Sequence, residues 1–514
     1  MRKQGTTQST KRSKLGMRKQ SQYSTTPPHI NKSLQNKEQM EFVLGGAIET
    51  LQENFVFNSS LGNKELFHSN LFGMLLMQNE SSEPLLKDVS QILSQIFAPK
   101  NREKVLPTNK YRVISVFREF HKFDLFIAYL DEDSYKQISE LEIGAEFFDA
   151  LRDATETITL KNVKDRDDYL QWKTALQILK KNSRFVVVEN KFKSLPDKVQ
   201  LFEYHGKVLR EIPFVAAGRN SVKISEFNTT FYLLNANLPK KEYPDIAPPW
   251  KQVFYADIVN KIDDLVDANL KSGDSFAAQY LKNYCEMLRF HLWLGLEITN
   301  SIRMHKGVFP DELFIEKLKK VRVSDFYEKM WFSKLACQFG INEADCGVKK
   351  DVIDFITEIG YTNGHGLLGY KCLWGDRSHI AYGVQIQNRQ FRIYVEPLPA
   401  KYYGVVEKIE DAPHHLSGSP KKSCVWADYD EKKFLDVLAQ VTRETLRELK
   451  SAKVDEDATQ RLCKFGDFKY VYVKLSKNIT QKQLSSLIKV ALSKLGDMVQ
   501  KNRKLFGVKS KKEV

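Results

Sequence analysis

The run "RFVVVENKF" places two charged side chains at the end of an apolar segment. Phe185 to Val188 are typical of a buried strand, and Glu189 and Lys191 follow with no turn residue between. Residues two apart on a strand point to the same face, so Glu189 and Lys191 project together while Asn190 faces away. A buried charge is costly unless it is paired or bound to a metal. The pattern therefore predicts either a salt bridge at a sheet's end or part of a metal-dependent site.

Asp124 is a second acid in an apolar run, "FDLFIAYL". If this run is a strand beside residues 185–191, Asp124 and Glu189 converge, and a divalent cation relieves the repulsion between the two carboxylates. A small set of oxygen ligands suits Mg²⁺ or Mn²⁺, which keep positions for water and substrate phosphate. The alternative is a structural salt bridge of Asp124 with Arg118 or Lys122.

Further candidates lie on two predicted helices. Glu65 stands in the first turn of "ELFHSNLFGMLL", where the alternative role of an acid is to interact with the helix dipole. His68 shares its face, although a lone histidine is more often packed than catalytic. Gln200 and Tyr204 share a face four residues apart, which amphipathic packing also explains.

A second Glu-x-Lys pattern occurs at Glu431, Lys432 and Lys433, within "DYDEKKFLDVL". No apolar strand precedes it, and the run is helical in pattern. We interpret this copy as a coincidence and assign no chemistry to it.

The order of the predicted elements indicates a mixed α+β chain. Two antiparallel strands are expected in "YRVISVFREF" and "KFDLFIAYL", then strands in "RFVVVENKF" and "TTFYLLNANL". Later, "HIAYGVQIQNRQFRIYVEPL" predicts a hairpin that turns at Asn388. The expected division is a disordered basic tail (1–37), a core (38–240) with a helical insertion (135–182), a helical region (241–358), a C-terminal α+β region (359–500) and a basic tail (501–514).

The charge of the chain is concentrated at its ends. The net charge is +15, of which residues 1–37 carry +9 and residues 501–514 carry +5, so the remainder is close to neutral. Such ends attract phosphates without sequence preference, or they are simply solvated. No apolar run is long enough to predict a membrane span.

The six cysteines (285, 337, 346, 372, 424 and 463) are scattered and lack a Cys-x-x-Cys spacing. They are expected to be reduced thiols in a cytoplasmic protein. A zinc site of His414, His415 and Cys424 is a minor alternative.

Six segments in this order resemble the PD-(D/E)XK nuclease superfamily, over residues of about 40 to 290. The resemblance is to a bacterial branch, and it rests on "ELFHSNLFGMLL", "FDLFIAYL", "FVVVENKF", "QLFEY" and the later pair "TTFYLLNANLP" and "WKQVFYADI". Two departures are the 64-residue distance between Asp124 and Glu189 and the presence of Phe123 where a proline often precedes the acid.

The resemblance implies a restriction-endonuclease-like mixed sheet flanked by helices, and roles for single residues. Asp124 and Glu189 would ligate Mg²⁺ or Mn²⁺, and Glu65 would complete the metal shell, through water for example. Lys191 would position the attacking water, and Gln200 would orient groups in the site. His68 and Tyr204 are weaker candidates for support.

The implied activity is metal-dependent hydrolysis of phosphodiester bonds, with DNA as the expected substrate and RNA left open, and with an anti-phage or restriction role. The rival hypotheses are a non-catalytic nucleic-acid-binding or regulatory protein on the same fold and an unrelated helical scaffold. A homodimer would provide two sites for cutting both strands. The C-terminal region is a candidate surface for a partner protein or nucleic acid, and its Trp331, Trp374, Arg377 and Tyr402 are either such readers or, as we favour, core residues.

Overall fold

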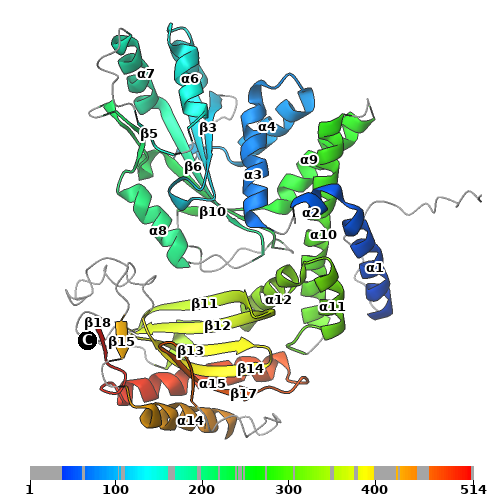
Figure 1. Cartoon of the computed structure of the whole chain (residues 1–514), viewed down its shortest axis with the longest axis vertical. Coiled ribbons are helices and arrows are strands. Elements are labelled where there is room, and N and C mark those ends of the chain that lie inside the picture. Colours follow the sequence, from blue (N-terminus) through cyan, green and yellow to red (C-terminus); the bar gives the residue numbers. More distant parts are fainter. Residues whose placement is uncertain are drawn as a thin grey trace, which may run out of the picture.

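The structure of the protein is a computed structural model with two large β-sheets joined by a group of helices (Figure 1). It describes residues 37–60, 64–101, 104–105, 110–154, 156–159, 168–193, 198–217, 220–237, 240, 246, 249–271, 275–304, 307–347, 352–374, 380–398, 424–426, 429–447 and 462–510. The predicted tail 1–37 lies almost wholly outside these ranges.

The first sheet has five strands in the order β10-β9-β6-β4-β3. The strands β3, β4 and β6 are antiparallel neighbours, whereas β6, β9 and β10 run parallel. Their bounds are β3 Tyr111–Arg118, β4 Leu125–Asp131, β6 Ser183–Lys191, β9 Thr229–Asn235 and β10 Trp250–Phe254. The predicted mixed sheet flanked by helices is confirmed.

A helical insertion separates β4 from β6 in sequence but not in space. It contains α5 (Glu132–Ser139), α6 (Gly144–Arg152), the short β5 (Ile158–Thr159) and α7 (Tyr169–Asn182). The two strands still pair directly, with Leu125 opposite Val188. The long distance between Asp124 and Glu189 therefore does not keep these two residues apart.

Both faces of this sheet are buried, which explains why its central strands are apolar throughout. Val186 and Val188 of β6 face a core with α3 (Glu65–Leu76), α4 (Pro84–Ile96), α9 (Tyr255–Leu270) and α10 (Phe276–Met304). Phe185 and Val187 face a second core with α6, α7 and α8 (Lys198–Leu209). Alternate residues at the end of β6 therefore point into two different environments.

The second sheet is antiparallel, in the order β11-β12-β13-β14-β17-β16, and α14 (Glu431–Arg447) and α15 (Gln481–Lys501) cover one face (Figure 1). Its strands are β11 Val352–Thr362, β12 His365–Trp374, β13 Ile380–Gln387, β14 Gln390–Pro397, β16 Cys463–Phe465 and β17 Phe468–Lys474. The predicted hairpin is confirmed, and Asn388 and Arg389 turn it with positive φ angles of 46° and 61°. Trp331 and Trp374 are buried, as favoured, while Arg377 and Tyr402 are outside the described residues.

The remaining elements are short or connect the two sheets. They are α1 Lys37–Glu53, α2 Phe55–Ser60, α11 Glu312–Lys320, α12 Ser324–Phe339, β1 Lys100–Asn101, β2 Lys104–Val105, β7 Pro213–Ala216, β8 Val222–Lys223, β15 Cys424–Trp426, β18 Val508–Ser510 and the 3₁₀ turns Met77–Glu80, Phe120–Lys122, Glu226–Asn228 and Glu343–Cys346. None of the helices in the described ranges is long and apolar enough to cross a membrane.

Three predicted boundaries differ from the structure. The strand β10 lies in the first sheet, although it falls in the predicted helical region 241–358, because a five-residue strand directly before a helix leaves little periodic signal. The strand β11 crosses the predicted boundary at 358. The strand β18 pairs with β15, so residues 508–510 of the predicted tail 501–514 are part of the fold.

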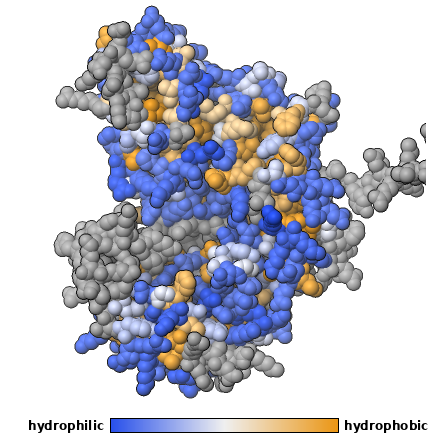
Figure 2. All heavy atoms as spheres, in the orientation of Figure 1, coloured by the Kyte–Doolittle hydropathy of each residue, from blue (hydrophilic) through white to orange (hydrophobic). Residues whose placement is uncertain are grey.

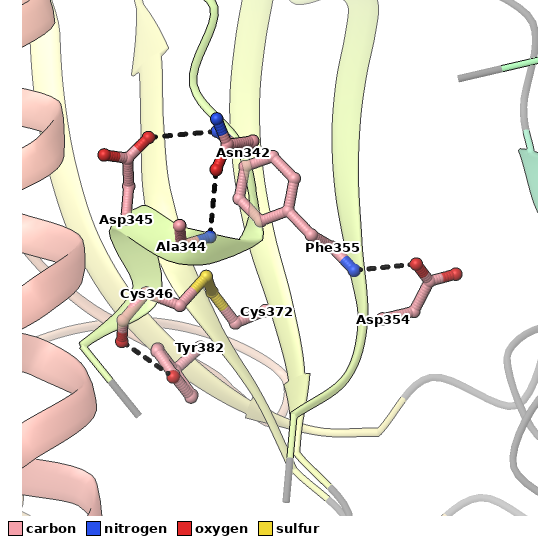
Figure 3. Close-up of a disulfide and its surroundings, with 8 residues drawn as sticks. All are labelled: Asn342, Ala344, Asp345, Cys346, Asp354, Phe355, Cys372 and Tyr382. Carbon is pink, nitrogen blue, oxygen red and sulfur yellow. Dashed lines mark hydrogen bonds between the residues drawn. A yellow bond between two sulfur atoms is a disulfide. The ribbon is translucent and has the colours of Figure 1, made fainter. Parts of the chain in front are cut away.

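The expectation of six reduced thiols is wrong for two of them. Cys346, at the end of a 3₁₀ turn, and Cys372, on β12, form a disulfide with their Cα atoms 6.7 Å apart (Figure 3). The phenol of Tyr382 donates to the carbonyl of Cys346 at 3.2 Å beside it. The pairing depends on how the turn packs on the sheet, so sequence spacing could not reveal it. Cys285, Cys337 and Cys463 are thiols, and the side chains of the suggested zinc ligands lie outside the described residues.

His291 on α10 lies where the first sheet meets α12. It is fully buried, its Nδ1 lies 2.8 Å from the Met287 carbonyl, and its ring packs against Phe192 and Phe326 at centroid distances of 5.1 and 4.9 Å. Burial lowers the pKa of His291 to about 4. The ring is therefore neutral at physiological pH, and a proton on it would be placed in an aromatic cluster.

The low pKa of His291 predicts acid sensitivity. The unfolded chain binds a proton near the ordinary histidine value of 6.5, and the folded chain does so only near 4, so stability is lost as pH falls through this window. The expected contribution is about 3 kcal/mol. In urea unfolding at pH 7 and pH 4.5, His291→Phe should lose less stability than wild type. His205→Gln, at a half-buried position on α8, serves as the control, and an unchanged loss in His291→Phe would contradict the assignment.

Candidate active site

The end of β6 brings Glu189, Lys191 and Asp124 together. Lys191 Nζ lies 2.6 Å from Glu189 Oε1, and Glu189 is fully buried. Asp124 stands just before β4 and accepts a hydrogen bond at Oδ2 from the Asn190 backbone N–H at 2.7 Å. The Asp124 carboxyl group is also close enough for its charge to act on Glu189. The predicted convergence of these side chains is therefore present, and neither alternative salt bridge of Asp124 is needed to explain its position.

Burial controls the charge of these groups. It raises the pKa of Glu189 to about 8, against the attraction of Lys191 and with a further contribution from Asp124. It also raises the pKa of Asp124. Burial alone would lower the pKa of Lys191, but the carboxylates of Glu189 and Glu65 outweigh it, and the pKa is raised. At neutral pH the two carboxyl groups thus hold one proton between them, and Lys191 is cationic.

Glu65 reaches the same place from the other side of the strand. It occupies the first turn of α3, and its Oε1 accepts hydrogen bonds from the backbone N–H groups of Phe192 at 3.1 Å and Lys193 at 3.4 Å. Its charge is close enough to act on both Asp124 and Lys191. Glu65 therefore fixes the chain that leaves β6, in addition to contributing negative charge.

Gln200 and Tyr204 form a chain of hydrogen bonds behind Lys191. Lys191 Nζ donates to Gln200 Oε1 at 3.1 Å, and Gln200 Nε2 donates to the Tyr204 hydroxyl at 2.7 Å. The Tyr204 ring packs edge-on against Phe123 at 5.1 Å, and burial raises its pKa to about 12. Because α8 packs on the face of β6 that bears Lys191, these polar residues orient the ammonium group rather than serve only as amphipathic packing.

Asn190 points to the opposite face and connects three elements there. Its Nδ2 donates to the Glu65 carbonyl at 2.9 Å and the Ser69 hydroxyl at 3.2 Å, and its Oδ1 accepts from the Tyr255 hydroxyl at 2.8 Å. Asn190 thus binds β6 to α3 and α9. Sequence reasoning gave this residue no role, although its place between two candidate residues was a signal.

His68 lies in the core rather than in the cluster. It is fully buried, its Nδ1 lies 3.1 Å from the Tyr284 hydroxyl, and its ring is 4.3 Å from that of Phe192. Its contribution is to hold α3 against the segment after β6.

Two residues from α12 also approach the cluster. Lys193 Nζ forms an ion pair with Asp325, and Lys329 is near enough to Glu65, Lys191 and Lys193 for their charges to affect its pKa, which burial lowers. Sequence reasoning missed Asp325 and Lys329, because nothing in their local pattern indicates a contact with residues over 130 positions earlier.

The carboxylates of Asp124, Glu189 and Glu65 partly match the ligand requirements of a divalent metal. Among the described residues, no three His, Cys, Asp or Glu side chains have the geometry of a preformed metal site. Asp124 and Glu189 nevertheless fit the requirement of Mg²⁺, which binds proteins through one or two carboxylates and keeps several waters. Glu65, with one oxygen on backbone N–H groups, fits contact through water.

A comparison with protein families shows which family the region around this site resembles. Residues 53–286 match the family model of the PD-(D/E)XK nuclease superfamily. This part of the chain is therefore similar to that superfamily. No curated protein and no solved structure matches the chain significantly. The match covers the first sheet, α3, α8 and the start of α10, and all of the residues that converge at the end of β6 except those of α12.

Similarity to the PD-(D/E)XK superfamily suggests a nuclease, and enzymes of this superfamily typically use divalent metals. The second copy of Glu-x-Lys does not share this setting. Glu431 begins α14, and the copy is exposed in a helix, as expected of a coincidence.

The three side-chain hydrogen bonds of Asn190 predict a large structural effect. Asn190→Ala leaves buried groups of α3 and α9 without their partner and should lower stability by about 2–3 kcal/mol. Tyr255→Phe removes only one of these bonds and should cost about 1 kcal/mol. Thermal or urea unfolding of both variants compares them directly. If Asn190→Ala is as stable as Tyr255→Phe, Asn190 does not hold these elements together.

Proposed function

We propose that the protein is a divalent-metal-dependent nuclease that hydrolyses phosphodiester bonds of DNA. The observation that carries the proposal is the meeting of Asp124, Glu189 and Lys191 at one end of the sheet, inside the region that matches the nuclease superfamily. Two carboxylates and a lysine side by side at the end of a sheet suit metal-assisted hydrolysis of a phosphate ester.

Each residue has a proposed role. Asp124 and Glu189 would hold the metal, which would supply Lewis acidity and lower the pKa of bound water. Lys191 would position the attacking water and stabilise negative charge on the phosphate, and its hydrogen bond to Gln200 keeps its ammonium group in place.

Supporting roles are proposed for three more residues. Tyr204 fixes Gln200 by accepting its amide hydrogen bond. Glu65 contributes to the metal shell through water while it holds the backbone after β6. His68 acts only through packing, because its ring lies in the core.

The finer assignments rest on the sequence. We propose DNA as the substrate and Mg²⁺, or Mn²⁺, as the cofactor, because both are expected of the branch that the motifs resemble. A restriction or anti-phage role in the cytoplasm follows from the same resemblance. We also propose a homodimer and a protein partner at the C-terminal region, on the same grounds. The five-part domain division, apart from the three boundaries discussed above, also remains a proposal.

The proposal predicts metal-dependent cleavage that requires Lys191. Wild type should cut supercoiled plasmid or single-stranded circular DNA with Mg²⁺ or Mn²⁺ and lose activity with a chelator. Lys191→Ala should reduce the rate by at least about 100-fold, because it removes charge stabilisation at the reacting phosphate. A parallel RNA substrate tests the choice of DNA.

Lys433→Ala provides a matched control within the same protein. Lys433 occupies the corresponding position in the exposed copy of Glu-x-Lys, with its side chain 70% exposed, so its loss should leave the rate unchanged. Cleavage that persists in Lys191→Ala would place the chemistry elsewhere. No cleavage of DNA or RNA by folded wild type would favour the alternative of a non-catalytic binding protein.

A further inference from the structure

The face of the second sheet opposite α14 and α15 carries a row of aromatic side chains. Val471 and Val473 of β17 point into the core, whereas Phe468, Tyr470 and Tyr472 alternate with them and are half-buried on the other face. The rings follow one another at centroid distances of 5.3 and 6.4 Å. We call these three residues the aromatic row. Lys474, exposed, continues it on the same face.

A cavity of about 530 Å³ lies beside the aromatic row. It runs from the β11–β12 hairpin to the β16–β17 turn, and the lining residues that matter here are Gln385, Gln387, Arg392, Glu396, Phe468 and Tyr470. Its size is within the usual range of small-ligand sites. The two amides and the two rings provide hydrogen-bonding edges and flat apolar surfaces side by side.

Arg392 is held flat within this surface. Its guanidinium lies 5.2 Å from the centre of the Tyr470 ring, and it donates to Gln385 Oε1 at 2.7 Å and to Gln390 Oε1 at 2.8 Å. Among the described residues, no carboxylate forms an ion pair with Arg392. With Lys474 it places positive charge along one side of the aromatic row.

The other side carries one ammonium group between two carboxylates. Lys371 is 5% exposed and lies 3.1 Å from Glu358 and 2.6 Å from Glu396, so its ammonium group is neutralised within the sheet. This side offers carboxylate and amide oxygens, which accept hydrogen bonds from amino groups. A ligand that fits therefore has flat rings with amino or imino edges, and a negative group next to Arg392.

We propose that this face binds the bases of single-stranded nucleic acid. Bases stack on aromatic side chains at about 1–3 kcal/mol each, and rings repeated along one strand receive successive bases. The amides of Gln385 and Gln387 would contact base edges, and Arg392 and Lys474 would contact phosphates. A double helix hides the flat faces of its bases, so it does not fit. The site is on the second sheet, beyond the residues of the family match, and its occupation does not depend on the proposed nuclease activity.

Binding without cleavage tests this proposal. The probe is a labelled oligothymidylate of about 12 nucleotides, long enough for several stacked bases, titrated in the presence of a chelator. The double variant Tyr470→Leu and Tyr472→Leu should weaken binding by roughly 10-fold or more, since it removes two stacking surfaces. Tyr470→Phe, which keeps the ring, should bind as wild type does.

Two controls locate the site. Phe227→Leu removes an aromatic ring that is 85% exposed on the first sheet's side of the molecule and should not change binding. Lys433→Ala should also bind normally, since Lys433 is exposed on α14, which covers the other face of the second sheet. Thermal unfolding of each variant confirms that it is folded.

Each of the following results would overturn the proposal. Wild type does not bind the oligonucleotide, the double variant binds it as tightly as wild type does, or thymidine monophosphate and duplex DNA both compete as well as the unlabelled oligonucleotide. Competition by the monophosphate alone, at concentrations equal to the oligonucleotide, would assign the face to free nucleotides and overturn the assignment to a strand.

Discussion

The burial of the Glu189 carboxyl group beside Asp124 is the constraint on which the first sheet depends. Removing two acids from water is costly, and Lys191 repays only part of that cost. The pair can persist only where neighbouring elements prevent it from reaching solvent. The helix α8 supplies Gln200 on one face of β6, and Asn190 binds α3 and α9 on the other face. The apolar strands and their two cores provide the stability that offsets the free-energy cost of burying these acids.

The same site is joined to the second sheet by α12. Asp325 in its first turn pairs with Lys193, two residues beyond Lys191. One turn later, Glu328 Oε2 accepts a hydrogen bond from the Gly366 N–H at 2.7 Å, in the β11–β12 hairpin. A Cβ atom at Gly366 would lie 2.8 Å from the Phe332 ring and 2.9 Å from Glu328, so only glycine permits this approach. Thr362 and Asn363 of that hairpin also line the cavity of the second sheet.

Local sequence patterns predicted strands and turns, but they could not predict contacts between residues that are distant in sequence. Four apolar residues before Glu189 were enough to identify β6, and alternation around Asn388 was enough to identify a hairpin. The motif order also brought Asp124 to Glu189 across a long insertion. By contrast, the Cys346–Cys372 disulfide and the pairing of Lys193 with Asp325 depend on how distant elements pack. For His68, face-sharing on a helix does not say whether that face meets a site or a core, and its ring lies in the core.

Opposite charges face one another at the end of β6. The carboxyl groups of Glu65, Asp124, Glu189 and Asp325 face the ammonium groups of Lys191, Lys193 and Lys329. Burial raises the pKa of both Asp124 and Glu189, so protonation of this pair is favoured and its negative charge is reduced. On the proposed function, a divalent cation bound by the pair would displace that proton and leave an excess of positive charge, which a phosphodiester would neutralise. Metal and substrate would then each favour the binding of the other.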